Sequence, residues 1–305
     1  MSILVVNIYE AIVQLTVFWI GAAIGSFLNV VVYRVPAGLS VIWPPSRCPK
    51  CFHQLGAGEN IPILGWLLLR GKCRHCKTPI SIRYPIVEAA TAIMFLLVYD
   101  RFGLSFETIG YSLFCCWLLA LSLIDLDTMT LPNSLTQSGL VVGLSFQVIY
   151  GFLDQFSPTG IKEHLIQGVF GMVLAIWVYD FIQLAGGMLL GQPAMGGGDA
   201  KLMAMIGAWL GWKSMMITGF LASVFGSVLM GGAMMFGLLQ RRQKFPLGPF
   251  ISLGAIVSLF WSEWLISSYK QFSQTTDRNL FFIPILVCLT VLFIWLRKTR
   301  VGARG

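Results

Sequence analysis

Charged side chains are scarce in this chain. They make up 11% of its 305 residues, whereas a typical soluble protein carries about 25%. Hydrophobic residues make up 56%, and the mean hydropathy is +0.78. This shortage of charge excludes a large water-soluble core, and the composition is typical of a protein that crosses a membrane several times.

No cleavable export signal is apparent, and the sequence shows no convincing internal repeat. The apolar run 11–32 is too long for the core of a signal peptide, and no small-residue cleavage site in a polar stretch follows it. We therefore expect this run to remain as the first membrane span. Many secondary transporters are built from repeated halves, so the lack of a repeat disfavours that class.

The hydrophobic runs predict nine membrane-spanning segments, because a span needs about 20 apolar residues. They cover roughly residues 11–33, 85–99, 108–124, 135–153, 164–190, 199–212, 214–238, 247–269 and 280–297. The second and sixth are short, and the sixth is a candidate half-length helix beside its neighbour. The expected fold is an all-α polytopic membrane protein with eight or nine spans.

The basic residues gather in three places, the loop 34–84 and the stretches 240–244 and 297–304. Cytoplasmic loops of membrane proteins carry an excess of Lys and Arg, so we expect all three on the cytoplasmic side. Nine crossings satisfy this expectation with the N-terminus outside, whereas eight would place one basic cluster outside. The count also places 125–134 and 191–199 on the cytoplasmic face. The net charge of +8 thus indicates topology rather than nucleic-acid binding.

Four of the seven cysteines form two C-x-x-C pairs in the basic loop, namely Cys48, Cys51, Cys73 and Cys76. Two such pairs at this separation are typical of a Zn²⁺ site with four thiolate ligands. A loop of this length has little core of its own, and a bound metal would supply folding free energy. Disulfides are disfavoured on the reducing cytoplasmic side. His53 and His75 could replace a cysteine ligand, although we expect them to be surface residues.

Few of the thirteen acidic residues lie at membrane depth, where ionisable groups are costly and usually face a cavity or a partner. Asp125 and Asp127 end the third segment, and Asp199 opens the sixth. We expect Asp180, inside the fifth segment, to be a structural partner of a polar group. Glu88, at the start of the second, is expected to face the cysteine loop.

Asp199 follows three glycines, Gly196, Gly197 and Gly198. Glycine permits the close approach of another backbone, so an extended peptide could lie along this stretch. An acid that caps an ordinary helix start would give the same pattern. Lys201 could serve as a counter-charge or extend to the membrane surface.

A second carboxylate at the same depth gives Asp199 a chemical role. Two close carboxylates share one proton, because both cannot ionise cheaply. One can then activate water while the other protonates a peptide group. Asp125 and Asp127 are both candidates for this partner. Residues two apart on a helix differ by a rotation of roughly 200°, so only one of them can face Asp199.

Several motifs in a fixed order resemble the type IV prepilin peptidases, a family of G-x-G-D aspartyl proteases. These motifs are Gly25–Pro36, both cysteine pairs, Glu59–Pro62, Leu69–Cys73, Arg83–Glu88, Asp125–Asn133, Gly196–Leu202 and Pro246–Phe250. The likeness covers nearly the whole chain. The family is typically described with one span fewer, and here the separation of Asp125 and Asp199 is somewhat longer than usual.

The resemblance implies removal of short basic leader peptides from prepilins and pseudopilins after a glycine, at the cytoplasmic face of a bacterial inner membrane. It also implies N-methylation of the new N-terminal residue by S-adenosylmethionine. In the family the catalytic acid stands seven residues before a proline, as Asp125 stands before Pro132. Asp125 and Asp199 are therefore the expected catalytic pair, and Asp127, Lys201, Gly196 and Gly198 are expected to support it.

No glycine-rich fingerprint locates the methyl donor, and Gly71 and Glu59 are candidates from the family motif of the loop. The implied organisation is a first transmembrane helix, a zinc lobe associated with methyl transfer, a protease bundle and a basic tail, over residues 1–33, 34–84, 85–297 and 298–305.

Two other classes remain open from the residues alone. A secondary transporter would also use an interrupted helix and acidic residues at mid-membrane, but has no need of a zinc lobe. A membrane thiol oxidoreductase would use C-x-x-C pairs, but without zinc and on the oxidising side.

Overall fold

The computed structural model describes residues 2–190, 196–237 and 245–275. The chain divides into two units, Met1–Phe260 and Trp261–Gly305, and the described part of the second unit is the end of one helix. The expected ninth span at 280–297, the tail 298–305 and the basic cluster 240–244 lie outside the described residues.

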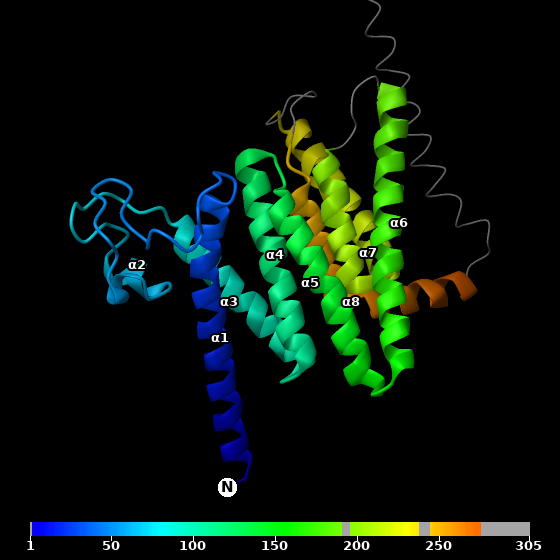
Figure 1. Ribbon diagram of the computed structural model, residues 1–305, viewed down its shortest axis with the longest axis horizontal. Coiled ribbons are helices and arrows are strands. Elements are labelled where there is room, and N and C mark those ends of the chain that lie inside the picture. The colour runs from blue at the N-terminus through cyan, green and yellow to red at the C-terminus, as the bar shows by residue number, and fades with distance from the viewer. Residues whose placement is uncertain (1, 191–195, 238–244, 276–305) are drawn as a thin grey trace, which may run out of the picture. The chain divides into compact units, whose positions relative to one another are not determined.

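The described residues are helical, apart from loops and two isolated β-bridges. The helices are α1 (Ser2–Arg34), η1 (Ala57–Glu59), α2 (Leu64–Leu68), α3 (Arg83–Phe102), α4 (Phe106–Thr128), α5 (Asn133–Gln155), α6 (Pro158–Leu190), α7 (Gly197–Met235) and α8 (Gly248–Thr275) (Figure 1). This all-helical structure confirms the predicted fold class. Residues 35–82, between α1 and α3, carry the cysteine pairs on a separate small lobe, which we call the cysteine lobe.

Six of the described helices are long and apolar enough to cross a membrane: α1, α4, α5, α6, α7 and α8. The segment expected at 85–99 is helical as part of α3, but α3 is not among these six. The segments expected at 199–212 and 214–238 together form α7. The eight predicted segments within the described residues therefore all form helices, whereas the predicted number of spans is not established.

α7 bends at Gly211, where the backbone adopts φ 75° and ψ 174° inside the helix. Glycine accepts this positive φ without a steric penalty. Near this bend the buried Gln147 side chain of α5 donates to the Trp209 carbonyl at 2.8 Å. A polar group within a membrane needs such an internal partner.

Close helix crossings hold α5, α6 and α7 together. A Cβ added to Gly171 of α6 would lie 2.6 Å from the carbonyl oxygen of Gly207 on α7, so these backbones touch. Small residues allow this approach inside a membrane, where association depends on packing rather than on the hydrophobic effect. Around the crossing lies a buried core that includes Phe114, Leu118 and Trp209.

α1, α3 and α4 form a second packed group (Figure 1). Its core contains Leu28, Phe95 and Ile124, one from each helix. A Cβ on Gly25 of α1 would lie 2.7 Å from the Cα of Glu88 on α3, so α1 and α3 cross in close contact. This packing places the start of α3 next to both the cysteine lobe and α4.

Candidate active site and metal centre

Asp125 lies in the last turn of α4 and is 5% exposed. The helix stops shortly after it, because Met129 adopts a left-handed conformation with φ 52° while its N–H donates to the Asp125 carbonyl at 2.8 Å. Pro132, which precedes the first residue of α5, cannot donate to a continuing helix. The Asp125 side chain is thus fixed at a sharp helix end.

The first residue of α8 holds the Asp125 carboxylate. The backbone N–H of Gly248 donates to Oδ2 of Asp125 at 2.8 Å. The free N–H groups and dipole at a helix N-terminus favour a negative charge there. A Cβ on Gly248 would lie 2.7 Å from that same oxygen, so only glycine fits without displacing the carboxylate.

Asp199 lies in the first turn of α7 and is 7% exposed. Its backbone N–H donates to the Gly196 carbonyl at 3.1 Å. Its carboxylate lies within electrostatic range of Asp125. Among the described acidic residues, only Glu88, Asp125 and Asp199 are buried. The structure therefore brings together two buried acids from motifs 74 positions apart in the sequence.

The glycines before Asp199 leave room on one side of the helix start. A Cβ on Gly197 would meet no atom of the described residues within 4 Å, so this side is open in the part of the chain that the structure describes. A Cβ on Gly198 would lie 3.1 Å from the side chain of Leu131, which joins this stretch to the chain just after α4. A Cβ on Gly196 would lie 3.6 Å from Oδ2 of Asp199. An extended chain could approach the acid from the side of Gly197.

The two remaining residues expected to support the acids, Asp127 and Lys201, have partners on other helices. Asp127 is exposed and pairs with Arg83 of α3. Lys201 is exposed, and its Nζ donates to the Asn133 side chain at 2.7 Å. Lys201 thus joins α7 to the start of α5, and no ion pair between it and Asp199 is found among the described residues.

Tyr179 of α6 is a neighbour of the site that the sequence did not single out. It is 7% exposed and within electrostatic range of Asp199. The following residue, Asp180, is exposed on α6. In the sequence Asp180 attracts attention because acids are rare inside spans. Tyr179 does not, because a single tyrosine in an apolar helix is common.

The four thiols of the cysteine lobe converge on one point. Their Sγ atoms all lie within 4.8 Å of one another, with 3.7 Å between Cys48 and Cys76 and 3.9 Å between Cys51 and Cys73. Tetrahedral zinc with Zn–S bonds near 2.3 Å requires sulfur atoms about 3.8 Å apart. The donor set and its geometry therefore fit Zn²⁺, which would tie the two halves of the lobe together.

The two cysteine pairs form equivalent loops. In each loop the first cysteine donates its N–H to the residue five positions later, His53 or Thr78, at 2.9 Å. In each the residue four positions after the first cysteine, Phe52 or Lys77, has φ 58°. The bridges Arg47–Gln54 and Lys72–Pro79 then close both loops in the same register. This duplication explains how 21 intervening residues still bring the four thiols to one centre.

Local hydrogen bonds favour the thiolate form at two positions. The side chain and backbone of Thr78 lower the pKa of Cys76 to about 6. The backbone amides of Cys51 and Lys50 lower the pKa of Cys48. Thiolates are the metal-binding form of cysteine, so these contacts prepare the site for a cation.

Gly71 and Glu59 both have structural contacts within the lobe. Gly71 has φ 65°, and a Cβ there would lie 2.7 Å from the Trp66 ring. Oε2 of Glu59 accepts from the Gly56 N–H at 2.8 Å and lies 3.8 Å from Nε2 of His53. The His53 and His75 rings pack edge to face, 5.1 Å apart. Neither the contacts of Gly71 nor those of Glu59 assign a methyl-donor site.

The two centres differ in what they can do. Buried paired acids beside an open backbone stretch can move protons during peptide hydrolysis. A closed four-thiolate zinc centre has no free coordination position and is structural.

Comparison with known proteins decides the family. Residues 19–102 match the bacterial peptidase A24 N-terminal domain, and residues 112–231 match the type IV leader peptidase family. The prepilin leader peptidase/N-methyltransferase of Stutzerimonas stutzeri is 37% identical over 84% of this chain and 93% of its own length.

The chain belongs to the type IV leader peptidase family. Relatives with the same name in Aeromonas hydrophila and Pseudomonas aeruginosa are 34% and 35% identical, over 83% of this chain and 93% and 92% of theirs. The transporter and thiol oxidoreductase alternatives gain no support from these relatives. No solved structure matches the chain. The two matched regions of this leader peptidase family member contain the cysteine lobe and the acid pair respectively.

Proposed function

We propose that this protein is a membrane endopeptidase that removes leader peptides from prepilins and pseudopilins and then methylates the new N-terminus. The observation that carries the peptidase proposal is that Asp125 and Asp199 are both buried, at two helix ends, within electrostatic range of each other. The sequence similarity to leader peptidase/N-methyltransferases supports the same reaction. Those relatives are named N-methyltransferases, and this name supports S-adenosylmethionine as the methyl donor.

In the proposed hydrolysis the two carboxyls hold one proton between them. The ionised carboxyl takes a proton from water, whose oxygen attacks the scissile carbonyl carbon. The protonated carboxyl donates its proton to the carbonyl oxygen. The other carboxyl then passes the proton it took from water to the departing amine, while the first recovers a proton from a hydroxyl of the tetrahedral intermediate and the C–N bond breaks. The Gly248 N–H favours the ionised form of Asp125, and this favours Asp125 as the base and Asp199 as the acid.

The open side at Gly197 is the proposed place for the substrate backbone. A substrate with a small residue before the scissile bond would fit close to this glycine stretch, which agrees with cleavage after glycine. The apolar helix that follows the leader would lie among the membrane helices. The basic leader would remain in water.

For the cysteine lobe we propose a structural Zn²⁺ bound by Cys48, Cys51, Cys73 and Cys76, and a role in methyl transfer. A bound zinc would stabilise a loop that has little core of its own. The donor would supply an electrophilic methyl group, and the amine released by cleavage would accept it. Gly71 and Glu59 remain candidates for this step through the motif in which they stand.

The proposed location is the bacterial inner membrane, with the N-terminus outside and both the lobe and the acid pair at the cytoplasmic face. The six candidate spans support a multi-pass membrane protein. The orientation depends on the basic residues of loop 34–84, because such residues are retained on the cytoplasmic side.

A peptide cleavage assay tests the proposed function. The purified protein in detergent receives a peptide with a basic leader, a Gly–Phe junction and an apolar helix, with and without S-adenosylmethionine. We expect mass spectrometry to show cleavage after the glycine in both samples, and one added methyl group only in the sample with donor. Intact peptide in both samples would refute the peptidase proposal.

A further inference from the structure

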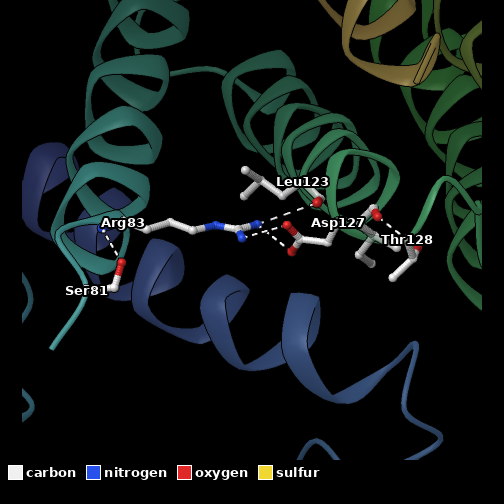
Figure 2. A network of polar contacts seen from close by, with 6 residues as sticks. Ser81, Arg83, Leu123, Asp127 and Thr128 are labelled. Atoms are coloured by element: carbon white, nitrogen blue, oxygen red, sulfur yellow. Dashed lines mark hydrogen bonds and ion pairs between the residues drawn. The ribbon is translucent and has the colours of Figure 1, made fainter. Parts of the chain in front are cut away.

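Arg83 and Asp127 form a two-pronged ion pair between α3 and α4 (Figure 2). Nη1 donates to Oδ1 and Nη2 donates to Oδ2, both at 2.7 Å. Nη2 also lies 3.5 Å from the carbonyl oxygen of Leu123, one turn earlier on α4. The planar fork of a guanidinium fixes the orientation of a carboxylate as well as its distance.

The pair acts on the turn that carries the candidate catalytic base. Asp127 is two residues after Asp125, so the two side chains leave α4 in different directions. Asp125 is buried and meets Gly248 of α8, while Asp127 is exposed and meets Arg83. The last turn of α4 is therefore held from two sides by two different helices.

This turn needs such support because α4 ends there. Met129 leaves the helical conformation, and the last turns of helices fray unless they are tied down. A small rotation of the turn would move the Asp125 carboxylate relative to Asp199. A misplacement of about 1 Å at a catalytic group can lower a rate by about 100-fold.

Arg83 is itself well anchored. It is the first residue of α3, and its backbone N–H donates to the Ser81 hydroxyl at 3.2 Å. In the next turn of α3 the Glu88 carboxylate accepts from the backbone N–H of Ile63 in the cysteine lobe at 2.6 Å. The start of α3 thus connects the lobe on one side with the end of α4 on the other.

We propose that Arg83 is a positioning residue for peptide cleavage, which orients Asp125 through its ion pair with Asp127. This inference rests on the proposed peptidase function. Both side chains of the pair are 41% exposed, and an ion pair this exposed contributes little to stability. Loss of Arg83 should therefore change the geometry of the site far more than the stability of the fold.

The test measures cleavage kinetics and thermal unfolding of Arg83→Ala in detergent. We expect kcat to fall about 10-fold while KM stays within about twofold, since the substrate still binds but Asp125 is misplaced. The unfolding temperature should remain close to that of the wild type. Arg83→Lys, which keeps the charge but loses the fork, should have an intermediate kcat.

Asp127→Asn removes the pair from the other side and should lower kcat to a similar extent. The exchange R83D/D127R restores opposite charges, so it should recover part of the kcat that is lost in R83D alone or in D127R alone. Arg101→Ala is the matched control, because it removes an exposed arginine from the last turn of the same helix. Its kcat should equal that of the wild type.

The outcomes separate this inference from the proposed function. If the wild type does not cleave the peptide, the peptidase proposal fails first. If the wild type cleaves and Arg83→Ala keeps its kcat, Arg83 does not position the site. A fall in kcat matched by an equal fall for Arg101→Ala, or by a large loss of thermal stability, would also overturn the positioning role.

Discussion

Two aspartates two positions apart have opposite environments in this protein. Asp125 is buried and bonded to a helix N-terminus, whereas Asp127 is exposed and bonded to an arginine. The rotation between neighbouring helical positions produces this difference. Its burial within electrostatic range of Asp199 makes Asp125 the stronger candidate for proton transfer.

We expect Asp125→Asn and Asp199→Asn each to lower cleavage by at least about 100-fold, because an amide cannot exchange a proton in this way. Asp127→Asn should keep measurable activity. The measurement is the rate of cleavage of the leader peptide by purified variants that still insert into membranes and bind zinc. Loss of activity in Asp127→Asn with full activity in Asp125→Asn would reverse the two roles, and full activity in Asp199→Asn would remove the aspartyl mechanism.

Gly248→Ala tests the contact between α8 and Asp125. The added Cβ would lie 2.7 Å from the carboxylate oxygen, so the carboxylate or the helix start must move. We expect cleavage to fall by about 10-fold or more while the protein remains folded. Gly232→Ala on α7 is the control, because a Cβ there meets no atom within 4 Å and should leave cleavage unchanged. Equal activity of the two variants would show that the contact is not needed.

The sequence could indicate acids at membrane depth but not their partners. Asp199 stood out because three glycines precede it, and Asp125 because a proline motif follows it. No such sequence signal marks the residues that contact these segments from other helices. They are Gly248 at Asp125, Tyr179 near Asp199 and Arg83 at Asp127, and packing alone brings them there. Gly248 and Arg83 lay within motifs of the family resemblance, which marked their segments without giving their contacts.

At the level of elements, the hydrophobic pattern located helices better than it located their ends. The sequence predicts two segments, 199–212 and 214–238, where the structure has the single helix α7, and the expected break between them lies near Gly211, where α7 bends. The polar residues at the ends of α3 shortened its apparent apolar run, although the helix extends from Arg83 to Phe102. A pattern of apolar residues records burial or lipid contact, and it does not record where capping ends a helix.

In the cysteine lobe the cluster of side chains was easier to predict than its contacts with the helices. The convergence of its four cysteines was predictable from spacing alone, since thiolates at this spacing suit one tetrahedral metal. The contacts of the lobe with the rest of the chain could not be predicted in this way, because they involve backbone groups. One example is the Ile63 N–H, which donates to the Glu88 carboxylate.

Removal of zinc should loosen the lobe and leave the protease centre largely intact. We expect Cys48→Ser or a strong chelator to increase hydrogen exchange over residues 37–84 and to lower methylation at least about 10-fold more than cleavage, because a small metal domain loses its fold without the metal. Metal analysis of the fresh wild-type protein should give one zinc per chain. The absence of zinc from that sample, or an equal loss of both activities, would contradict this division of labour.

At the scale of the whole molecule, the two matched regions of the chain contain different clusters of polar side chains. The acid pair is built from the ends of α4 and α7, and the cysteine lobe lies between α1 and α3. They share no residue, and the contacts that join them run through the start of α3. The two activities should therefore be separable by substitution.

The order of the two reactions follows from the chemistry of nitrogen. The nitrogen of an intact peptide bond is a poor nucleophile, whereas the amine released by cleavage can attack the methyl group of S-adenosylmethionine. Asp199→Asn should therefore leave a full-length precursor unmethylated but should still methylate a peptide that already begins at the residue after the leader. Cys48→Ser should show the reverse pattern, with cleavage of the precursor and little methylation of either peptide. Mass spectrometry of both peptides with both variants gives the result. Failure of Asp199→Asn to methylate the shortened peptide, when the wild type does so, would show that the acid pair is needed for methyl transfer as well as for cleavage.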